Sequence, residues 1–246
     1  MSAKHIRRAA ATLALIALLS ACSPKDSEPE ITYDYQIDME KYQTAIHTKD
    51  KAYLLLANKQ HPLGSTHKPE ELSTLPAELT LYGKEIQLES TVALAAEAMV
   101  RELRACGYTD IAITSGYRSY TYQQGLFNTY LGNEQAAHPD WSRKECEAMV
   151  LTYSARPGES EHQTGLCIDL ISQKNVVLDE TFANHPAYEW LTENAHCFGF
   201  ILRYPADKTV TTGYSYEPWH YRFVGVKAAA EIHEQGITLE EYLAEE

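Results

Sequence analysis

Two short stretches of the sequence bring together residue types that bind metals and move protons. The first is SEHQTGLCIDL, residues 160–170, in which His162 lies in a polar loop and Asp169 follows seven residues later inside an apolar run. A carboxylate in such a run is costly to bury unless hydrogen-bond donors or a metal ion compensate it. Taken alone, Asp169 fits either role, as an acceptor of backbone hydrogen bonds or as a metal ligand.

The second stretch is YEPWHYRFVG, residues 216–225, where His220 stands between two aromatic residues and Glu217 precedes it by three positions. A single histidine among aromatic residues is more often a core residue than a ligand. Three positions along a strand reverse the face, but Pro218 marks an irregular start, so Glu217 and His220 can still point into one cleft. Neither stretch alone therefore identifies a metal site.

Together they supply two imidazoles and one carboxylate, which form a common catalytic zinc set with the fourth position left for water. A further carboxylate that does not bind the metal is the proton acceptor which such a water needs. The sequence thus predicts a zinc site with His162, Asp169 and His220 as ligands and Glu217 as the base.

The elements that position these residues follow from periodicity and turn residues. Apolar residues at helical spacing predict a helix over 89–105, and short apolar runs predict strands, among them 166–171 and 217–224. The other expected helices are 120–131, 141–153, 186–197, 226–235 and 238–245, and the other expected strands are 52–56, 110–114 and 200–204. Because helices and strands alternate unevenly, we expect an α+β fold, a small antiparallel sheet with flanking helices and the zinc site in a cleft on the sheet.

The amino-terminal segment has the pattern of an export signal. Residues 1–22 have a basic start, an apolar run too short to span a membrane, and the ending Leu-Ser-Ala-Cys, which resembles the bacterial lipobox with Cys22 as the lipidated residue. Residues 23–45 are polar and acidic and are expected to form a flexible tether. The domain is then expected to cover 46–246. The pattern predicts a protein of the bacterial cell envelope, lipid-anchored on the outer side of the cytoplasmic membrane, or in the periplasm of a Gram-negative host.

The overall charge excludes one class of partner. The chain has a formal charge of −13, and without residues 1–22 it keeps 18 basic and 34 acidic residues, a charge of −16. No basic patch balances these acids, so we expect no nucleic-acid partner. We expect a monomer. Export permits disulfides, but four cysteines allow three pairings and free thiols fit the sequence equally well, so Cys106, Cys146, Cys167 and Cys197 stay unassigned.

Four blocks of the sequence resemble the VanY-type D-alanyl-D-alanine carboxypeptidases, which belong to the zinc peptidases that trim bacterial cell-wall peptides. The resemblance covers about residues 50–230, and EPWHYR is its most specific part. The blocks are SGYRSYTYQ (115–123), PGESEHQTGLCIDL (157–170), ENAHCFGFILRYP (193–205) and TGYSYEPWHYRFVG (212–225). One departure is Cys167, where members of this family usually carry a small aliphatic residue.

The resemblance implies roles for individual residues. It implies the same three zinc ligands and the same base, Glu217, and it implies that Arg118 contacts the scissile region of the substrate. In the related LD-carboxypeptidases a glutamine spaced like Gln123 contacts the peptide, which makes Gln123 a substrate-binding candidate. Ser160 and Trp219 are further candidates for substrate contact, although Ser160 fits a loop-shaping role and Trp219 a core position equally well.

The implied function is a zinc-dependent DD-carboxypeptidase that removes the terminal D-alanine of peptidoglycan stem peptides. Two alternatives remain open: an LD-carboxypeptidase that acts on tetrapeptide stems with the same machinery, and a non-catalytic envelope-binding lipoprotein of the same fold. The intact ligand set and Glu217 argue against the second alternative.

Overall fold

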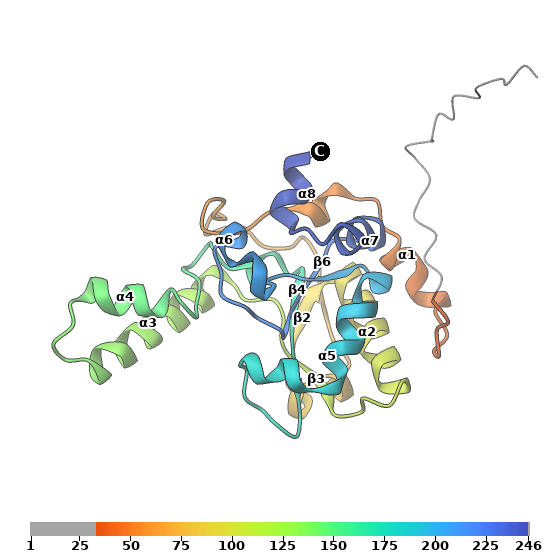
Figure 1. Cartoon of the computed structure of the whole chain (residues 1–246), viewed down its shortest axis with the longest axis horizontal. Coiled ribbons are helices and arrows are strands. Elements are labelled where there is room, and N and C mark those ends of the chain that lie inside the picture. Colours follow the sequence, from red (N-terminus) through yellow and green to blue (C-terminus); the bar gives the residue numbers. More distant parts are fainter. Residues whose placement is uncertain (1–32, 246) are drawn as a thin grey trace, which may run out of the picture.

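The computed structural model describes residues 33–245 of the chain. A four-stranded antiparallel sheet forms its centre, with the strand order β3-β4-β6-β5 (Figure 1). The strands are β3 (Ile111–Ser115), β4 (Cys167–Ser172), β5 (Phe200–Leu202) and β6 (His220–Phe223). A separate two-stranded antiparallel sheet joins β1 (Leu72–Thr74) and β2 (Gln87–Glu89). The predicted α+β class with a small antiparallel sheet is confirmed.

Helix α2 (Ser90–Ala105) is the main helix of the core. The side chain of Glu89 accepts hydrogen bonds from the backbone nitrogens of Thr91 and Val92, which satisfies two free donors of the first turn. Its buried face packs with residues of the central sheet and of β2 in one hydrophobic cluster. The shorter helices are α1 (Gln43–Ile46), α5 (Pro186–Asn194), α6 (Thr209–Thr212), α7 (Val226–Gln235) and α8 (Leu239–Glu245).

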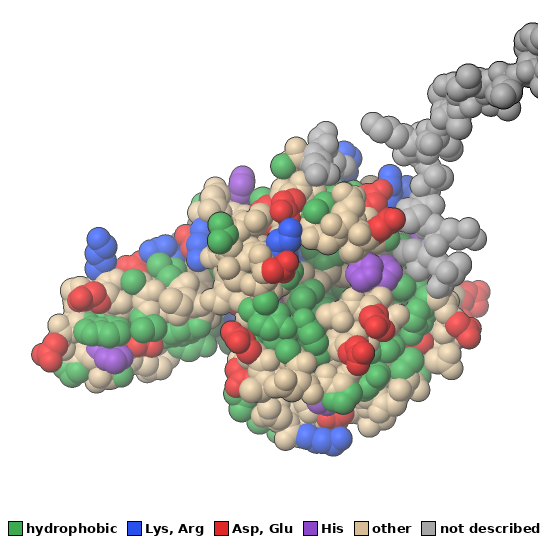
Figure 2. Space-filling view, viewed as in Figure 1, with side chains coloured by type: hydrophobic (Ala, Val, Ile, Leu, Met, Phe, Trp, Pro, Cys, Tyr) green, Lys and Arg blue, Asp and Glu red, His purple; other side chains and the backbone are tan. Residues whose placement is uncertain are grey.

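Helices α3 (Tyr120–Ala137) and α4 (Arg143–Val150) form a hairpin that projects from the body of the molecule (Figures 1 and 2). The hairpin has a small core of its own, made of Phe127, Leu131, Cys146 and Val150. Helix α3 begins at Ser119, whose side chain accepts a hydrogen bond from the Tyr122 nitrogen. The start of α3 is therefore fixed next to the SGYR block, while its far end points away from the sheet.

Two sequence predictions differ from the structure. The expected strand 52–56 is wrong, because residues Lys51–Leu54 form a 3-10 helix capped by the side chain of Asp50.

Of the expected tether, residues 33–45 lie in the described part of the chain and pack on the core, with Tyr42 buried and Tyr35 packed against it. The folded part therefore reaches back at least to residue 33, ahead of the expected boundary at 46. The expected signal segment 1–22, with Cys22, lies outside the described residues.

The remaining cysteines are free thiols. Cys106 is exposed, and Cys146, Cys167 and Cys197 are buried. Among residues 33–245, no helix is both long and apolar enough to cross a membrane.

Candidate metal and catalytic site

The register of the central sheet brings two of the predicted ligands together. Asp169 on β4 lies directly opposite His220 on the antiparallel strand β6. Directly opposite residues of an antiparallel pair present their side chains on the same face. The third residue, His162, lies in a one-turn 3-10 helix, Glu161–Thr164, which leads into β4. All three side chains are almost fully buried.

The distances within this trio match what a metal requires. The Nε2 atom of His162 lies 3.1 Å from Oδ2 of Asp169, and Nδ1 of His220 lies 3.0 Å from Oδ1 of the same carboxylate. Zinc–nitrogen and zinc–oxygen bonds of about 2.0–2.1 Å in a tetrahedral site place neighbouring ligand atoms about 3.3 Å apart. Both nitrogen–oxygen distances are therefore close to the spacing of ligand atoms around a zinc ion.

The outer nitrogens of both imidazoles are held by acceptors. Nδ1 of His162 lies 2.6 Å from the carbonyl oxygen of Gly116, and Nε2 of His220 lies 3.4 Å from Oε2 of Glu161. Because a carbonyl oxygen only accepts, Nδ1 of His162 must carry a proton, so Nε2, which faces Asp169, is the nitrogen that can bind a metal. An acceptor on the far nitrogen is the usual support of a metal-binding histidine.

The thiol of Cys167 is a fourth donor beside the trio. Cys167 lies two residues before Asp169 on β4 and so shares its face, and its sulfur lies within 4.8 Å of a ring nitrogen of both His162 and His220. Burial raises the pKa of this thiol, but the two imidazoles outweigh that effect and lower it to about 7. The oxygens of Asp169, the ligand that the sequence predicts, lie 3.0 and 3.1 Å from ring nitrogens of the two histidines.

Glu217 lies beside the trio without joining it. It precedes β6 in a turn closed by the hydrogen bond from the His220 nitrogen to the Glu217 carbonyl, and its Oε2 atom is 3.7 Å from Nδ1 of His220. The turn at Pro218 thus brings the side chains of Glu217 and His220 close together, as the sequence predicts. Burial raises the pKa of Glu217 to about 7; the charge of His220 lowers it by a smaller amount, and the charge of Asp169 raises it further. A carboxyl group with a pKa near neutral is suited to exchange protons.

The site opens into a cavity of about 530 Å³ that all the predicted substrate-contact residues line. The buried Nε of Arg118 has no hydrogen-bond partner among the described residues, and neither has Oε1 of Gln123. Gln123 is held by its Nε2, which donates to the Ala155 carbonyl at 2.8 Å. Ser160 is buried, and Trp219 packs against the core as well as lining the cavity. Unpaired polar atoms in a cavity wall are suited to bind a polar ligand.

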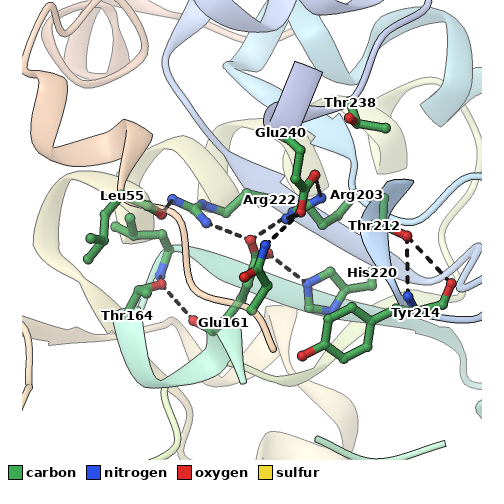
Figure 3. Close-up of polar contacts among 12 residues, drawn as sticks. Leu55, Glu161, Thr164, Arg203, Thr212, Tyr214, His220, Arg222, Thr238 and Glu240 are labelled. Carbon is green, nitrogen blue, oxygen red and sulfur yellow. Dashed lines mark hydrogen bonds and ion pairs between the residues drawn. The ribbon is translucent and has the colours of Figure 1, made fainter. Parts of the chain in front are cut away.

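The sequence analysis did not identify three charged residues near the site: Glu161, Arg203 and Arg222 (Figure 3). All three side chains are fully buried. Glu161 accepts a hydrogen bond from Arg203 Nε at 2.7 Å and another from Arg222 Nη1 at 2.7 Å. Burial alone would raise the pKa of Glu161, but the charges of the two arginines hold it well below its usual range. Arg203 and Arg222 stand among apolar residues in FILRY and HYRFV, as Asp169 does in its strand, so the cost of burying a charge indicates a buried ion pair at these positions too.

Gly165 ends the turn that carries His162. Its φ of +70° is one that side chains rarely adopt, and an added Cβ would lie 2.8 Å from Cγ of Pro69. We expect Gly165→Ala to lower the free energy of unfolding by about 1–3 kcal/mol. Urea unfolding measures this change. Gly132→Ala is the control, because Gly132 lies in helix α3 with open space around it and alanine should stabilise that helix. Equal stability of both variants would contradict the expected strain.

Comparison with known families places this arrangement in context. The family model described as VanY, D-alanyl-D-alanine carboxypeptidase, matches residues 85–226, more than half of the chain. The chain is 37% identical over 190 residues to a D-alanyl-D-alanine carboxypeptidase of Enterococcus faecalis, with 77% of this chain and 65% of that protein covered. It is 36% identical over 194 residues to a bifunctional D-Ala-D-Ala dipeptidase and carboxypeptidase of Enterococcus gallinarum, with 77% and 92% covered.

Solved structures show the same relationship. The LdcB LD-carboxypeptidase has a TM-score of 0.68 at 36% identity, with 80% of this chain and 89% of that chain covered. VanYB in complex with D-alanine-D-alanine has a TM-score of 0.65 at 35% identity, with 79% and 98% covered. A vancomycin resistance D,D-pentapeptidase VanY variant in complex with Zn(II) has a TM-score of 0.64 at 35% identity, with 78% and 99% covered.

Proposed function

Because the chain belongs to the VanY family of D-alanyl-D-alanine carboxypeptidases, we propose that it is a zinc-dependent carboxypeptidase that removes the C-terminal D-alanine from peptidoglycan stem peptides. One observation carries the proposal: two imidazole nitrogens meet one carboxylate at 3.0 and 3.1 Å, with Glu217 beside them at the end of an open cavity. The VanYB structure with bound D-alanine-D-alanine supports the choice of substrate.

In this proposal Nε2 of His162, the carboxylate of Asp169 and Nδ1 of His220 hold the zinc ion. When bound, zinc supplies Lewis acidity, which makes water a stronger acid and polarises a carbonyl group. Glu217 takes the proton of the attacking water and later delivers it to the amine of the leaving D-alanine. Its near-neutral pKa suits it to both steps.

Two further residues act on the substrate. The guanidinium of Arg118 has a free, buried Nε and lines the same cavity, so it is suited to stabilise negative charge that develops on the scissile carbonyl. Gln123 offers an unpaired amide oxygen to a peptide nitrogen. Ser160 and Trp219 complete the wall of the cavity near the trio.

Digestion of purified muropeptides tests the proposal. We expect the zinc-loaded protein to release D-alanine from pentapeptide stems and not from tetrapeptide stems, and a chelator to stop the release. Release from tetrapeptides alone would favour an LD-carboxypeptidase, an alternative supported by the similarity to LdcB. A folded protein that binds zinc and stem peptides but releases no D-alanine would favour the non-catalytic alternative.

Gln123→Ala is expected to raise the KM for the pentapeptide about 3-fold to 10-fold with little change in kcat, because one hydrogen bond to the peptide is lost. Steady-state kinetics of D-alanine release measure both constants. Gln135→Ala, in the same helix but away from the cavity lining, is the matched control. A fall in kcat at constant KM would mean that Gln123 acts in the transition state instead.

We also propose that the protein is a lipoprotein of the bacterial envelope, anchored through Cys22 and acting as a monomer. The lipobox pattern supports the anchor. Cys22→Ala is expected to move the protein from the membrane fraction to the soluble envelope fraction and to abolish lipid labelling of the chain. Retention in the membrane without lipid label would contradict the anchor. Light scattering of the purified domain tests the monomer.

A further inference from the structure

Glu161 stands behind the site and touches one of the proposed ligands. Its Oε2 atom lies 3.4 Å from Nε2 of His220, on the side of the ring away from Asp169. Its Oε1 atom accepts from Arg203 and Arg222, both at 2.7 Å. Glu161, Arg203 and Arg222 are all fully buried, so water does not replace these contacts.

This arrangement determines which nitrogen of His220 carries a proton. A carboxylate that accepts from two guanidinium groups is ionised and can only accept hydrogen bonds. The contact at Nε2 of His220 therefore requires an N–H there, and the neutral ring then keeps its lone pair on Nδ1. Nδ1 lies 3.0 Å from Oδ1 of Asp169, where the metal is expected, so it is the nitrogen that can bind the ion. The carboxylate of Glu161 thus selects the tautomer that binds.

The two arginines hold Glu161 in place from different segments. Arg222 lies two residues after His220 on β6, and its Nη2 donates to the carbonyl oxygens of Tyr53 and Leu55 at 3.0 and 2.7 Å. Arg203 follows β5 and uses its other two nitrogens on Glu240, at 2.8 and 2.6 Å. Each guanidinium is fixed by several partners, so the carboxylate between them has little freedom to turn (Figure 3).

Glu240 connects this network to the carboxy-terminal helix. It lies in α8, beyond residue 226, where the family model ends. Helix α8 is anchored by Leu239, which is fully buried in the second hydrophobic cluster, and by Thr238 and Glu241, which cap each other's backbone nitrogens. Glu161 and Glu240 balance the charges of the two arginines, so removal of Glu240 would leave a buried net positive charge beside Glu161.

We infer that Glu161 is a positioning residue for the metal ligand His220, and that helix α8 sustains it through the Glu240–Arg203 pair. The carboxy-terminal helix is then part of the apparatus that holds the metal, although none of its residues lines the cavity. This inference rests on the proposed function, because it takes His220 as a ligand.

Zinc affinity, measured by competition with a chromophoric chelator, tests the inference without any activity assay. Loss of an acceptor behind a metal-binding histidine typically weakens metal binding about 10-fold to 100-fold. We expect Glu161→Gln to weaken zinc binding by a factor in this range. Glu240 is one step further from the metal, so Glu240→Gln should weaken zinc binding by a factor near the lower end, about 10-fold. Glu161→Asp keeps the charge and should recover part of the loss. Glu241→Gln is the matched control: it weakens the cap of α8 but leaves the network intact, so its affinity should equal that of the wild type.

Nitrogen-15 NMR of the histidines in the zinc-loaded protein gives a second readout. We expect His220 of the wild type to bind through Nδ1 with a slowly exchanging N–H at Nε2, and we expect that proton to exchange faster in Glu240→Gln. The same spectra show whether each variant is folded. Wild-type affinity and exchange in both Glu161→Gln and Glu240→Gln would overturn the inference. If His220→Ala itself bound zinc as the wild type does, the proposed metal site would fail instead, so the two failures are distinguishable.

Discussion

Glu217→Gln is expected to lower kcat for D-alanine release by a factor of about 10²–10⁴ while zinc remains bound. The amide matches the carboxylate in size but cannot take a proton from water. Glu217 lies 3.7 Å from His220 Nδ1, outside the trio that meets at 3.0 and 3.1 Å, so its replacement should not remove a ligand. Steady-state kinetics on a pentapeptide stem measure kcat, and a metal assay of the same sample measures its zinc content.

Glu180→Gln is the matched control for this variant. Glu180 is an exposed carboxylate that lines the same cavity, so it tests whether any loss of negative charge there slows the reaction. We expect kcat to stay within about twofold, since exposed charges are screened by water and salt. The assignment of the base would be wrong if Glu217→Gln kept wild-type kcat. A slow variant that had also lost its zinc would instead make Glu217 part of the metal site.

Local patterns in the sequence predict the two strands of the site but not how these strands pair. The apolar run around Asp169 predicts a buried strand, and the EPWH block predicts a second one that begins irregularly at Pro218. Both strands are present, and their antiparallel pairing sets Asp169 opposite His220. No sequence rule gives that register, because it depends on contacts between segments 51 residues apart.

The segment 52–56 shows why other parts of the fold are harder to predict from the sequence. Its apolar run AYLLL is typical of a strand, but among residues 33–245 no strand pairs with it through backbone hydrogen bonds. Instead, the carbonyl oxygens of Tyr53 and Leu55 accept from the buried guanidinium of Arg222, 169 and 167 residues away. Beside the local cap by Asp50, one partner of this segment is thus a charged side chain far along the sequence. Local periodicity contains no information about it.

Arg222→Met is expected to lower the free energy of unfolding by about 3–5 kcal/mol, a large share of the stability of a typical domain. Methionine fills much of the volume but leaves Glu161 with one arginine and leaves the carbonyl oxygens of Tyr53 and Leu55 without their donor. Buried acceptors that lose their donors retain the full cost of leaving water. Urea unfolding of the metal-free protein in a chelator measures the change, because bound zinc would add its own stabilisation.

Arg156→Met separates the effect of burial from that of losing any ion pair. Arg156 bonds Glu147 at 2.8 Å, a distance close to the 2.7 Å of the Arg222–Glu161 contact, but its side chain is 41% exposed whereas that of Arg222 is fully buried. Exposed pairs contribute about 0–1 kcal/mol, so this variant should unfold close to the wild type. Similar losses of unfolding free energy in the two variants would mean that burial does not make the Arg222 contacts more stabilising than an exposed ion pair.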